Sequence, residues 1–156
     1  MHLFLLRHAH AVDYAASDLA RPLSEKGHQQ TREVASVLLN YPTRPELVLS
    51  STAVRAMETA SPVAAALGVE LRPCAWAVPG MEPESALGAL REFQHAKAIL
   101  LVGHQPDLGD LMALLLGIRL PERLHVRKAL IAHLRLHTTH SAPFATLEAF
   151  LPCRHP

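Results

Sequence analysis

The sequence predicts an α/β protein, a three-layer α/β/α sandwich around a mainly parallel central sheet. Short apolar runs of strand length alternate along the 156 residues with stretches of helical periodicity, which is the pattern of βαβ units. Two of the runs, at 2–6 and 98–102, are almost entirely apolar. Runs of this kind are typical of strands buried on both faces of a parallel sheet.

Six segments have the length and composition of strands. They are predicted at 2–6, 47–50, 69–72, 97–102, 129–136 and 145–151. The segment 69–72 alternates in polarity like a short edge strand, and the last two segments are expected to pair antiparallel at an edge. His133, Arg135 and His137 alternate with leucines, which predicts the solvated face of an edge strand.

Four stretches of helical periodicity separate the strands. Helices are predicted at about 24–39, 52–67, 84–94 and 106–117. Ser24 is a suitable N-cap for the first helix, and Gly68 suits the left-handed position that closes the second. Pro106 is favourable in the first turn of the last helix, since proline fixes a helical φ.

Length and composition indicate one domain, expected over 1–151, with a frayed tail at 152–156. A chain of this size buries about two thirds of its unfolded surface. The formal net charge is +1 and the basic residues are scattered, so nothing indicates a nucleic-acid partner. The apolar run 111–116 is too short to cross a bilayer, and the N-terminal run is too short for a signal peptide. We expect a soluble, cytoplasmic monomer that does not bind membranes.

Basic side chains follow three of the predicted strands. Arg7 and His8 follow the first strand, Arg55 the second, and His104 the strand at 97–102. Ligands of open α/β sheets bind beyond the carboxyl ends of the strands, so these side chains are expected to meet. Guanidinium groups grip phosphoryl oxygens in bidentate fashion, and nearby positive charge keeps an imidazole neutral and nucleophilic. The sequence therefore predicts a phosphate-handling pocket.

These residues lie in segments that resemble the signatures of the histidine phosphatase (phosphoglycerate mutase-like) superfamily. Residues 6–9 (LRHA) resemble its Arg-His-Gly signature, with alanine in place of glycine. Residues 50–60 (SSTAVRAMETA) look like the second signature, and 102–106 (VGHQP) look like the second catalytic histidine motif. The segments 16–24 and 128–132 are similar to the SixA-type phosphohistidine phosphatase branch. The resemblance covers nearly the whole chain and implies a phosphoglycerate mutase-like fold.

The resemblance also implies a role for each basic residue. His8 would be the nucleophile that carries a transient phosphoryl group, and Arg7, Arg55 and His104 would form the phosphate pocket with it. Arg21 matches a segment that could contact phosphate or the leaving group.

Three further polar residues belong to the same expected site. Arg21 could instead form a loop salt bridge with Asp18, and the sequence leaves these two readings open. Ser51 and Gln105 lie within the matching motifs and are expected to bind substrate.

The chain departs from the family at the general acid. Many members carry a catalytic carboxylate in the loop after the third strand, where this chain has Gly80. Glu82 and Glu84 are the nearby candidate proton donors, although loop glutamates are more often simply solvated. An imidazole leaving group needs less protonation than an alkoxide, so this departure favours phosphohistidine over alkyl phosphates.

The sequence therefore predicts a phosphatase that acts on protein phosphohistidine through a phosphohistidine enzyme intermediate. Its partners would be a phosphorylated protein and phosphate, and no metal or other cofactor is expected. Cys74 and Cys153 have neither metal spacing nor a disulfide framework. Two alternatives stay open, a small-molecule phosphomonoesterase on the same fold and a phosphate-dependent binding module without turnover. A histidine-rich metal protein is disfavoured, because metal-ligand spacing is absent.

Overall fold

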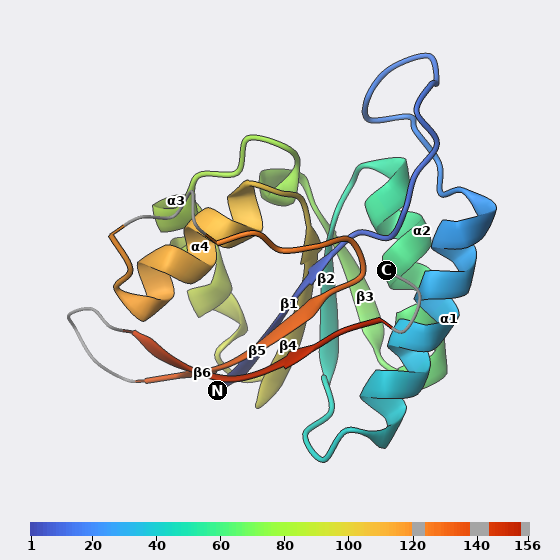
Figure 1. The fold of residues 1–156 in the computed structure, drawn as a ribbon. Helices are drawn as coiled ribbons and strands as arrows, with labels where there is room; N and C mark the ends of the chain where they lie inside the picture. Colours follow the sequence, from blue (N-terminus) through green and yellow to red (C-terminus); the bar gives the residue numbers. More distant parts are fainter. Residues whose placement is uncertain (120–123, 138–143, 154–156) are drawn as a thin grey trace.

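Six strands form one mainly parallel sheet at the centre of the protein (Figure 1). The structure, a computed structural model, describes residues 1–119, 124–137 and 144–153. The strands are β1 (His2–Arg7), β2 (Leu47–Ser51), β3 (Glu70–Cys74), β4 (Ala98–Gly103), β5 (Ile131–Leu136) and β6 (Ala145–Leu151). Their order is β3-β2-β4-β1-β5-β6. The strands β3, β2, β4 and β1 pair in parallel, and β5 is antiparallel to both of its neighbours, β1 and β6. The predicted α/β architecture, including the short edge strand β3, is confirmed.

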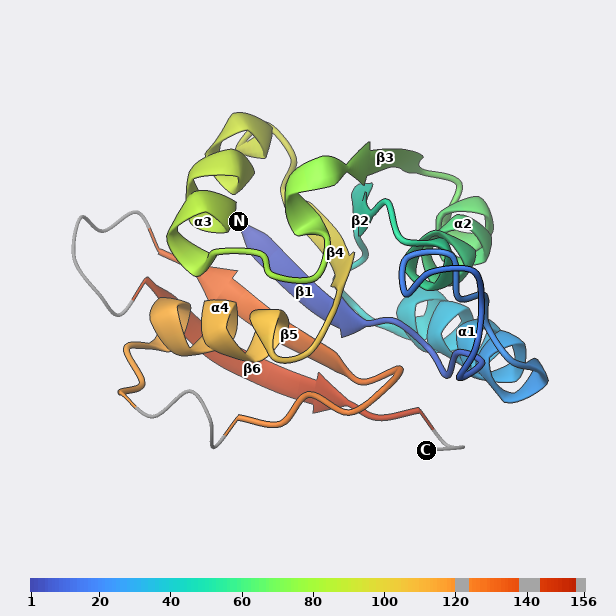
Figure 2. The same ribbon diagram turned by 90° about the horizontal axis from the view of Figure 1, so that it is seen from above.

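Helices cover both faces of the sheet (Figure 2). They are α1 (Glu25–Asn40), α2 (Val54–Leu67), α3 (Pro83–Leu90) and α4 (Asp107–Leu116), with 3₁₀ turns η1 (Ala75–Ala77) and η2 (Arg91–Phe93). Figure 2 shows α1 and α2 on one side of the sheet and α3 and α4 on the other. The helix expected to reach Gln94 ends at Leu90 and tightens into η2, as helix C-termini commonly do.

The core lies in two layers, one on each face of the sheet. Leu3 and Leu5 of β1 pack in the cluster that contains apolar residues of α3 and α4. Phe4 and Leu6 point the other way and pack with apolar residues of α1 and α2. This division follows from the two-residue side-chain period of a strand. It explains why β1 is a continuous apolar run rather than an alternating one.

The segment after β1 is anchored on the first turn of α1. The Ser24 hydroxyl accepts a hydrogen bond from Gly27 N at 3.2 Å, which confirms the expected N-cap. The His10 carbonyl accepts from Ser24 N at 2.9 Å, and His10 N donates to Gln30 Oε1 at 2.9 Å. Any Cβ at position 27 would collide with the His10 carbonyl, so this close approach requires glycine. These contacts fix the backbone just beyond the first expected site residues.

One prediction about β5 is wrong. β6 is the edge strand, and β5 lies between β6 and β1. His133 is therefore only 4% exposed and stacks on Phe4, with a centroid distance of 4.2 Å. Its Nε2 lies 2.9 Å from His2 Nδ1, and its Nδ1 lies 3.0 Å from the Tyr41 hydroxyl. The other two polar residues of that alternating pattern are exposed as expected.

The end of the described chain is packed rather than frayed at Cys153. Cys153 is buried, and its thiol donates to Glu33 Oε2 at 2.7 Å. Residues 154–156 of the expected tail lie outside the described residues. Among the helices of the described chain, none has the length and apolar character needed to traverse a bilayer.

Candidate active site

The pairing of β1 with β4 brings the two expected histidines side by side. Arg7 pairs with Gly103 in the parallel register, so the next residues, His8 and His104, leave the sheet together. His8 N donates to the Gly103 carbonyl at 3.0 Å, and the two imidazole centroids lie 5.2 Å apart. β2 ends on the other side of β4, so α2 begins at the same sheet edge. The structure thus places residues from distant parts of the sequence at one edge.

Hydrogen bonds define the tautomer of His8. Its Nδ1 lies 2.7 Å from the Ala9 carbonyl, which can only accept, so Nδ1 carries the proton. Nε2 is left with its lone pair and accepts from Arg55 Nε at 3.2 Å. The imidazole is 6% exposed. Burial, together with the electrostatic effects of His104, Arg55 and Arg7, lowers the pKa of His8 to about 3, although the hydrogen bond to the Ala9 carbonyl acts in the opposite direction. The structure therefore holds an unprotonated nitrogen at the position expected for the nucleophile.

His104 is also neutral in the free site. Arg55 Nη2, which can only donate, lies 3.4 Å from His104 Nδ1, so Nδ1 accepts and the proton is on Nε2. Nε2 donates to Ser51 Oγ at 2.8 Å, and Ser51 Oγ also accepts from Ala53 N at 3.2 Å. Burial, followed by the charge of Arg55, lowers the pKa of His104 to about 4. Ser51 thus orients His104, and His104 must gain a proton before Nδ1 can donate to a phosphoryl oxygen.

Arg55 is the centre of the cluster. It lies in the first turn of α2 and is 5% exposed, and its guanidinium contacts both histidines. Thr59, one turn later, accepts from Ala9 N at 3.1 Å and donates to the Arg55 carbonyl at 2.7 Å. This contact ties α2 to the residue after His8. Thr59 is not among the site residues predicted from the sequence, although its position four residues after Arg55 places both on one helix face.

Arg7 has a donor that nothing in the free site uses. Its Nη1 donates to the Val126 carbonyl at 3.0 Å. Among the described residues, Arg7 Nε is the buried side-chain nitrogen or oxygen that lacks a hydrogen-bond partner. An unpaired buried donor costs about 1–3 kcal/mol, so a group that accepts from Arg7 Nε would recover this energy. An oxyanion at this sheet edge would be such a group.

Gln105 is engaged with the backbone rather than aimed at a ligand. Its Nε2 donates to the Leu124 carbonyl at 3.1 Å, and its Oε1 accepts from Val126 N at 3.3 Å. Both ends of the amide are therefore occupied. We infer that Gln105 acts indirectly, by holding the segment whose Val126 carbonyl binds Arg7.

Arg21 forms the salt bridge with Asp18, which was one of the two interactions predicted for it. Its Nη1 lies 3.0 Å from Asp18 Oδ1, and its Nε donates to the Val12 carbonyl at 2.7 Å. The same Asp18 carboxylate also contacts Arg55, at 2.9 Å between Oδ2 and Nη2. The hydrogen bonds from Arg21 and Arg55 lower the pKa of Asp18, which keeps it ionised. Sequence spacing indicates the first contact but not the second, which joins residues far apart in the chain.

The loop at the expected acid position has a glycine conformation. Gly80 has a φ of 93°, a left-handed value that would strain a glutamate at this position. Its N–H donates to Asp107 Oδ2 at 3.0 Å, and burial raises the pKa of Asp107. Glu82 and Glu84 are exposed, as the N-cap residue and in the first turn of α3. Negative charge at the N-terminus of α3 interacts favourably with the helix dipole, so both glutamates have a structural role that does not involve catalysis.

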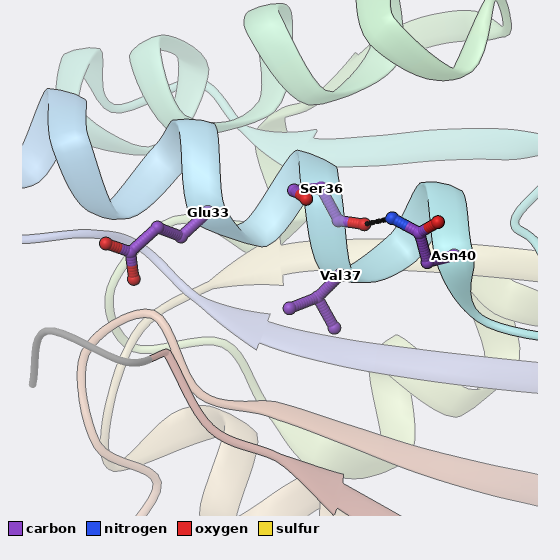
Figure 3. A pocket seen from close by; sticks show the side chains of 4 residues that line it. All are labelled: Glu33, Ser36, Val37 and Asn40. Carbon is purple, nitrogen blue, oxygen red and sulfur yellow. Dashed lines mark hydrogen bonds between the residues drawn. The ribbon is translucent and has the colours of Figure 1, made fainter.

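Metal-ligand clusters and pockets outside the arginine and histidine cluster are two further places where chemistry could occur. Within residues 1–119, 124–137 and 144–153, the structure contains no group of three or more His, Cys, Asp or Glu side chains placed to hold a metal ion. A pocket on α1 is lined by Glu33, Ser36, Val37 and Asn40, with Asn40 Nδ2 donating to the Ser36 carbonyl at 2.8 Å (Figure 3). These lining residues are separate from the histidine and arginine cluster.

The lowered pKa values of the two histidines predict that the protein loses stability in mild acid. Both imidazoles are neutral in the folded and unfolded chain above pH 6.5, the ordinary histidine pKa. Below that pH the unfolded chain gains protons that the folded chain does not, down to about pH 4 for His104 and about pH 3 for His8. Each histidine then lowers the free energy of unfolding by about 1.4 kcal/mol per pH unit.

Urea unfolding between pH 7.5 and 4.5 measures this slope. The variant His8→Asn removes one of the two groups, so its stability should fall less steeply below pH 6.5 than that of the unchanged protein. Identical slopes would show that His8 does not have a lowered pKa.

Comparison with known proteins agrees with this geometry. The model of the histidine phosphatase superfamily (branch 1) matches residues 3–75. The chain is 31% identical over 119 residues to the phosphohistidine phosphatase SixA of Escherichia coli K12, covering 72% of this chain and 73% of that protein. The structure of the protein histidine phosphatase SixA complexed with tungstate superimposes with a TM-score of 0.86 at 25% identity, covering 97% and 96% of the two chains.

The fold is shared more widely than this. The alpha-ribazole phosphatase of Shigella flexneri superimposes with a TM-score of 0.78 over 95% of each chain, at 22% identity. That likeness concerns the fold alone, whereas the Escherichia coli relative matches in sequence. The chain is therefore a hydrolase of the histidine phosphatase superfamily and belongs to its SixA-type family.

Proposed function

We propose that this enzyme hydrolyses phosphohistidine on proteins through a covalent phosphohistidine at its own His8. The observation that carries the proposal is the state of His8, whose Nε2 is unprotonated and lies beside the Arg55 guanidinium. A neutral imidazole held in one tautomer is a nucleophile, and the arginines match the phosphoryl oxygens. The sequence relative named as a phosphohistidine phosphatase supports the same substrate class.

The proposed reaction has two displacements at phosphorus. In the first, His8 Nε2 attacks as the bond to the substrate imidazole breaks, and the leaving imidazole takes its proton from water. In the second, water attacks the phosphoryl group on His8, which releases phosphate and restores Nε2. Arg7 and Arg55 stabilise the negative charge on the phosphoryl oxygens in both steps.

His104 changes its protonation state in this scheme. It is neutral in the free site because burial and the Arg55 charge lower its pKa. A phosphoryl dianion beside it brings negative charge and therefore raises the pKa again. With Nδ1 protonated, His104 donates to a phosphoryl oxygen while Ser51 continues to hold Nε2.

The acid loop favours phosphohistidine over alkyl phosphates. Gly80 occupies the place where the family resemblance implies a carboxylate, and its backbone conformation suits glycine. Glu82 and Glu84 are exposed. A leaving imidazole needs little help from an enzyme acid, whereas an alkoxide needs a proton in the transition state. In this proposal the enzyme works as a cytoplasmic monomer on a phosphorylated protein, without metal or other cofactor.

Turnover of four substrates side by side tests the proposal: a phosphohistidine protein, a phosphohistidine peptide, p-nitrophenyl phosphate and an alkyl phosphate. The two phosphoramidates should be preferred. The alkyl phosphate should be slower than p-nitrophenyl phosphate by about the general-acid factor of ~10²–10⁴, because its leaving group needs protonation. Glu82→Gln and Glu84→Gln should barely change phosphohistidine hydrolysis.

Each contrary result selects another reading. A loss of about the general-acid factor in either glutamine variant would identify that glutamate as the acid and support a small-molecule phosphomonoesterase. Phosphate binding without turnover of any substrate would support the binding module.

A further inference from the structure

The Asp18 carboxylate contacts Arg55, which the proposed function assigns to phosphate, and also Arg21. Its Oδ2 is 2.9 Å from Arg55 Nη2, and its Oδ1 is 3.0 Å from Arg21 Nη1. The Asp18 carbonyl also accepts a hydrogen bond from Arg55 Nη1. Arg55 Nε donates to His8 Nε2, and Nη2 also lies beside His104 Nδ1. Every nitrogen of the central guanidinium is therefore engaged in the free enzyme.

A phosphoryl group cannot use the Arg55 N–H groups that face Asp18 and His8 while these contacts persist. It must approach His8 Nε2, the nucleophile of the proposed reaction, and it must accept from the Arg55 N–H groups. A carboxylate and a phosphoryl group are both oxyanions that match the arginine fork. Asp18 therefore stands where a phosphoryl oxygen is expected.

We propose that Asp18 is an internal competitor of phosphate, a positioning residue that holds Arg55 and Arg21 between turnovers and gives way when a phosphoryl group binds. On return it displaces the phosphate product from the same arginines. This inference rests on the proposed phosphate-binding role of Arg55. It assigns to Asp18 an effect on phosphate affinity rather than on the chemical step.

The burial pattern allows the Asp18 side chain to move while its backbone stays. The side chain is 57% exposed, within an exposed segment at 13–19. That segment is fixed at its ends, where Val12 N donates to the Pro22 carbonyl at 3.0 Å and Val54 N donates to the Leu19 carbonyl at 2.9 Å. A change of side-chain rotamer is enough to release Arg55 Nη2. Rotamer changes of exposed side chains are fast compared with enzyme turnover.

The charges at the site explain why such a competitor is useful. Arg7 and Arg55 both lower the pKa of His8 and of His104, so several positive groups lie close together. Without an anion they repel one another. The ionised Asp18 carboxylate offsets that repulsion in the free enzyme, because the hydrogen bonds from Arg21 and Arg55 keep its pKa low. The same charge opposes tight retention of phosphate.

Titration calorimetry with inorganic phosphate and with tungstate tests the proposal on Asp18→Asn. Binding of both anions should tighten by about three- to fivefold, the upper part of the scale for losing a partly exposed competing ion pair. KM for p-nitrophenyl phosphate should fall in parallel, and kcat should not rise, because the product is held longer. In a tungstate complex of the unchanged enzyme, the Asp18 carboxylate should no longer contact Arg55 Nη2.

Asp13→Asn is the matched control. Asp13 is an exposed acid on the same segment, so its replacement changes the net charge equally. Its effect on anion affinity should stay within about twofold, the limit for screened surface charge. Equal effects of the two variants would overturn the proposal, since general charge would then explain them.

The remaining outcomes separate this proposal from the proposed function. Weaker or unchanged anion binding in Asp18→Asn would show that Asp18 only orients the arginines, and the proposal that it competes with phosphate would be wrong. Absence of anion binding in both proteins would overturn the competition together with the phosphate role of Arg55. Tighter anion binding without any phosphohistidine turnover would support competition between Asp18 and phosphate and would contradict only the proposed phosphohistidine substrate.

Discussion

Replacement of His8 by alanine is expected to abolish turnover while the protein stays folded. The loss should be on the order of 10⁴-fold or more, the scale seen when a catalytic nucleophile is removed. The fold should persist because the backbone bond from position 8 to the Gly103 carbonyl does not use the side chain. Phosphatase activity, together with circular dichroism and thermal unfolding, measures the two parts separately.

The covalent intermediate gives this prediction a second readout. Quenching in alkaline denaturant during turnover of labelled substrate should trap phosphate on His8, as an adduct that acid destroys and alkali preserves. His28→Ala is the matched control, because His28 is an exposed histidine of α1. It should keep both the activity and the label. Label on a serine or an aspartate, or label that persists in His8→Ala, would contradict the mechanism.

Arg55→Ala should produce the second largest loss. Removal of one preorganised charge partner of a transition state typically costs about 10²–10³-fold in kcat. Arg55 contacts both His8 Nε2 and His104 Nδ1, so its loss removes the positive group that lies between the two histidines of the expected pocket. The pKa of His8 and of His104 should rise, because the Arg55 charge lowers both. Both should remain below the ordinary value, since burial is the largest cause in each case.

Steady-state kinetics and an NMR titration of the histidine rings measure these effects. Arg72→Ala is the control, because Arg72 is a partly exposed arginine of β3 that pairs with Glu70. It should change neither quantity. Arg55→Lys keeps the positive charge but loses the planar pair of N–H donors that binds an oxyanion in bidentate fashion. Its activity should therefore lie between those of Arg55→Ala and the unchanged enzyme. Full activity in Arg55→Ala would show that the phosphate pocket is elsewhere.

Local order in this protein follows from interactions within a few residues, which the sequence displays directly. Ser24 caps α1, and Gly68 closes α2 with a φ of 68°, because each position depends only on its own turn of helix. The continuous apolar run of β1 indicates a strand covered on both faces, and in the structure an apolar cluster packs on each face. The strand ends at which His8 and His104 occur could be predicted for the same reason.

Contacts across the fold depend on strand order and register, which no local pattern contains. The sequence by itself determined the alternation of strands and helices, the helix caps, and the strand ends that carry His8 and His104. Tertiary structure alone decided that His133 is buried, because β6 rather than β5 forms the edge of the sheet. It also decided that Asp18 reaches Arg55 and that Asp107 holds Gly80, since each pair joins separate loops and helices. Hydrophobic periodicity and turn propensity act over a few residues, whereas these pairs exist only once the whole sheet has assembled.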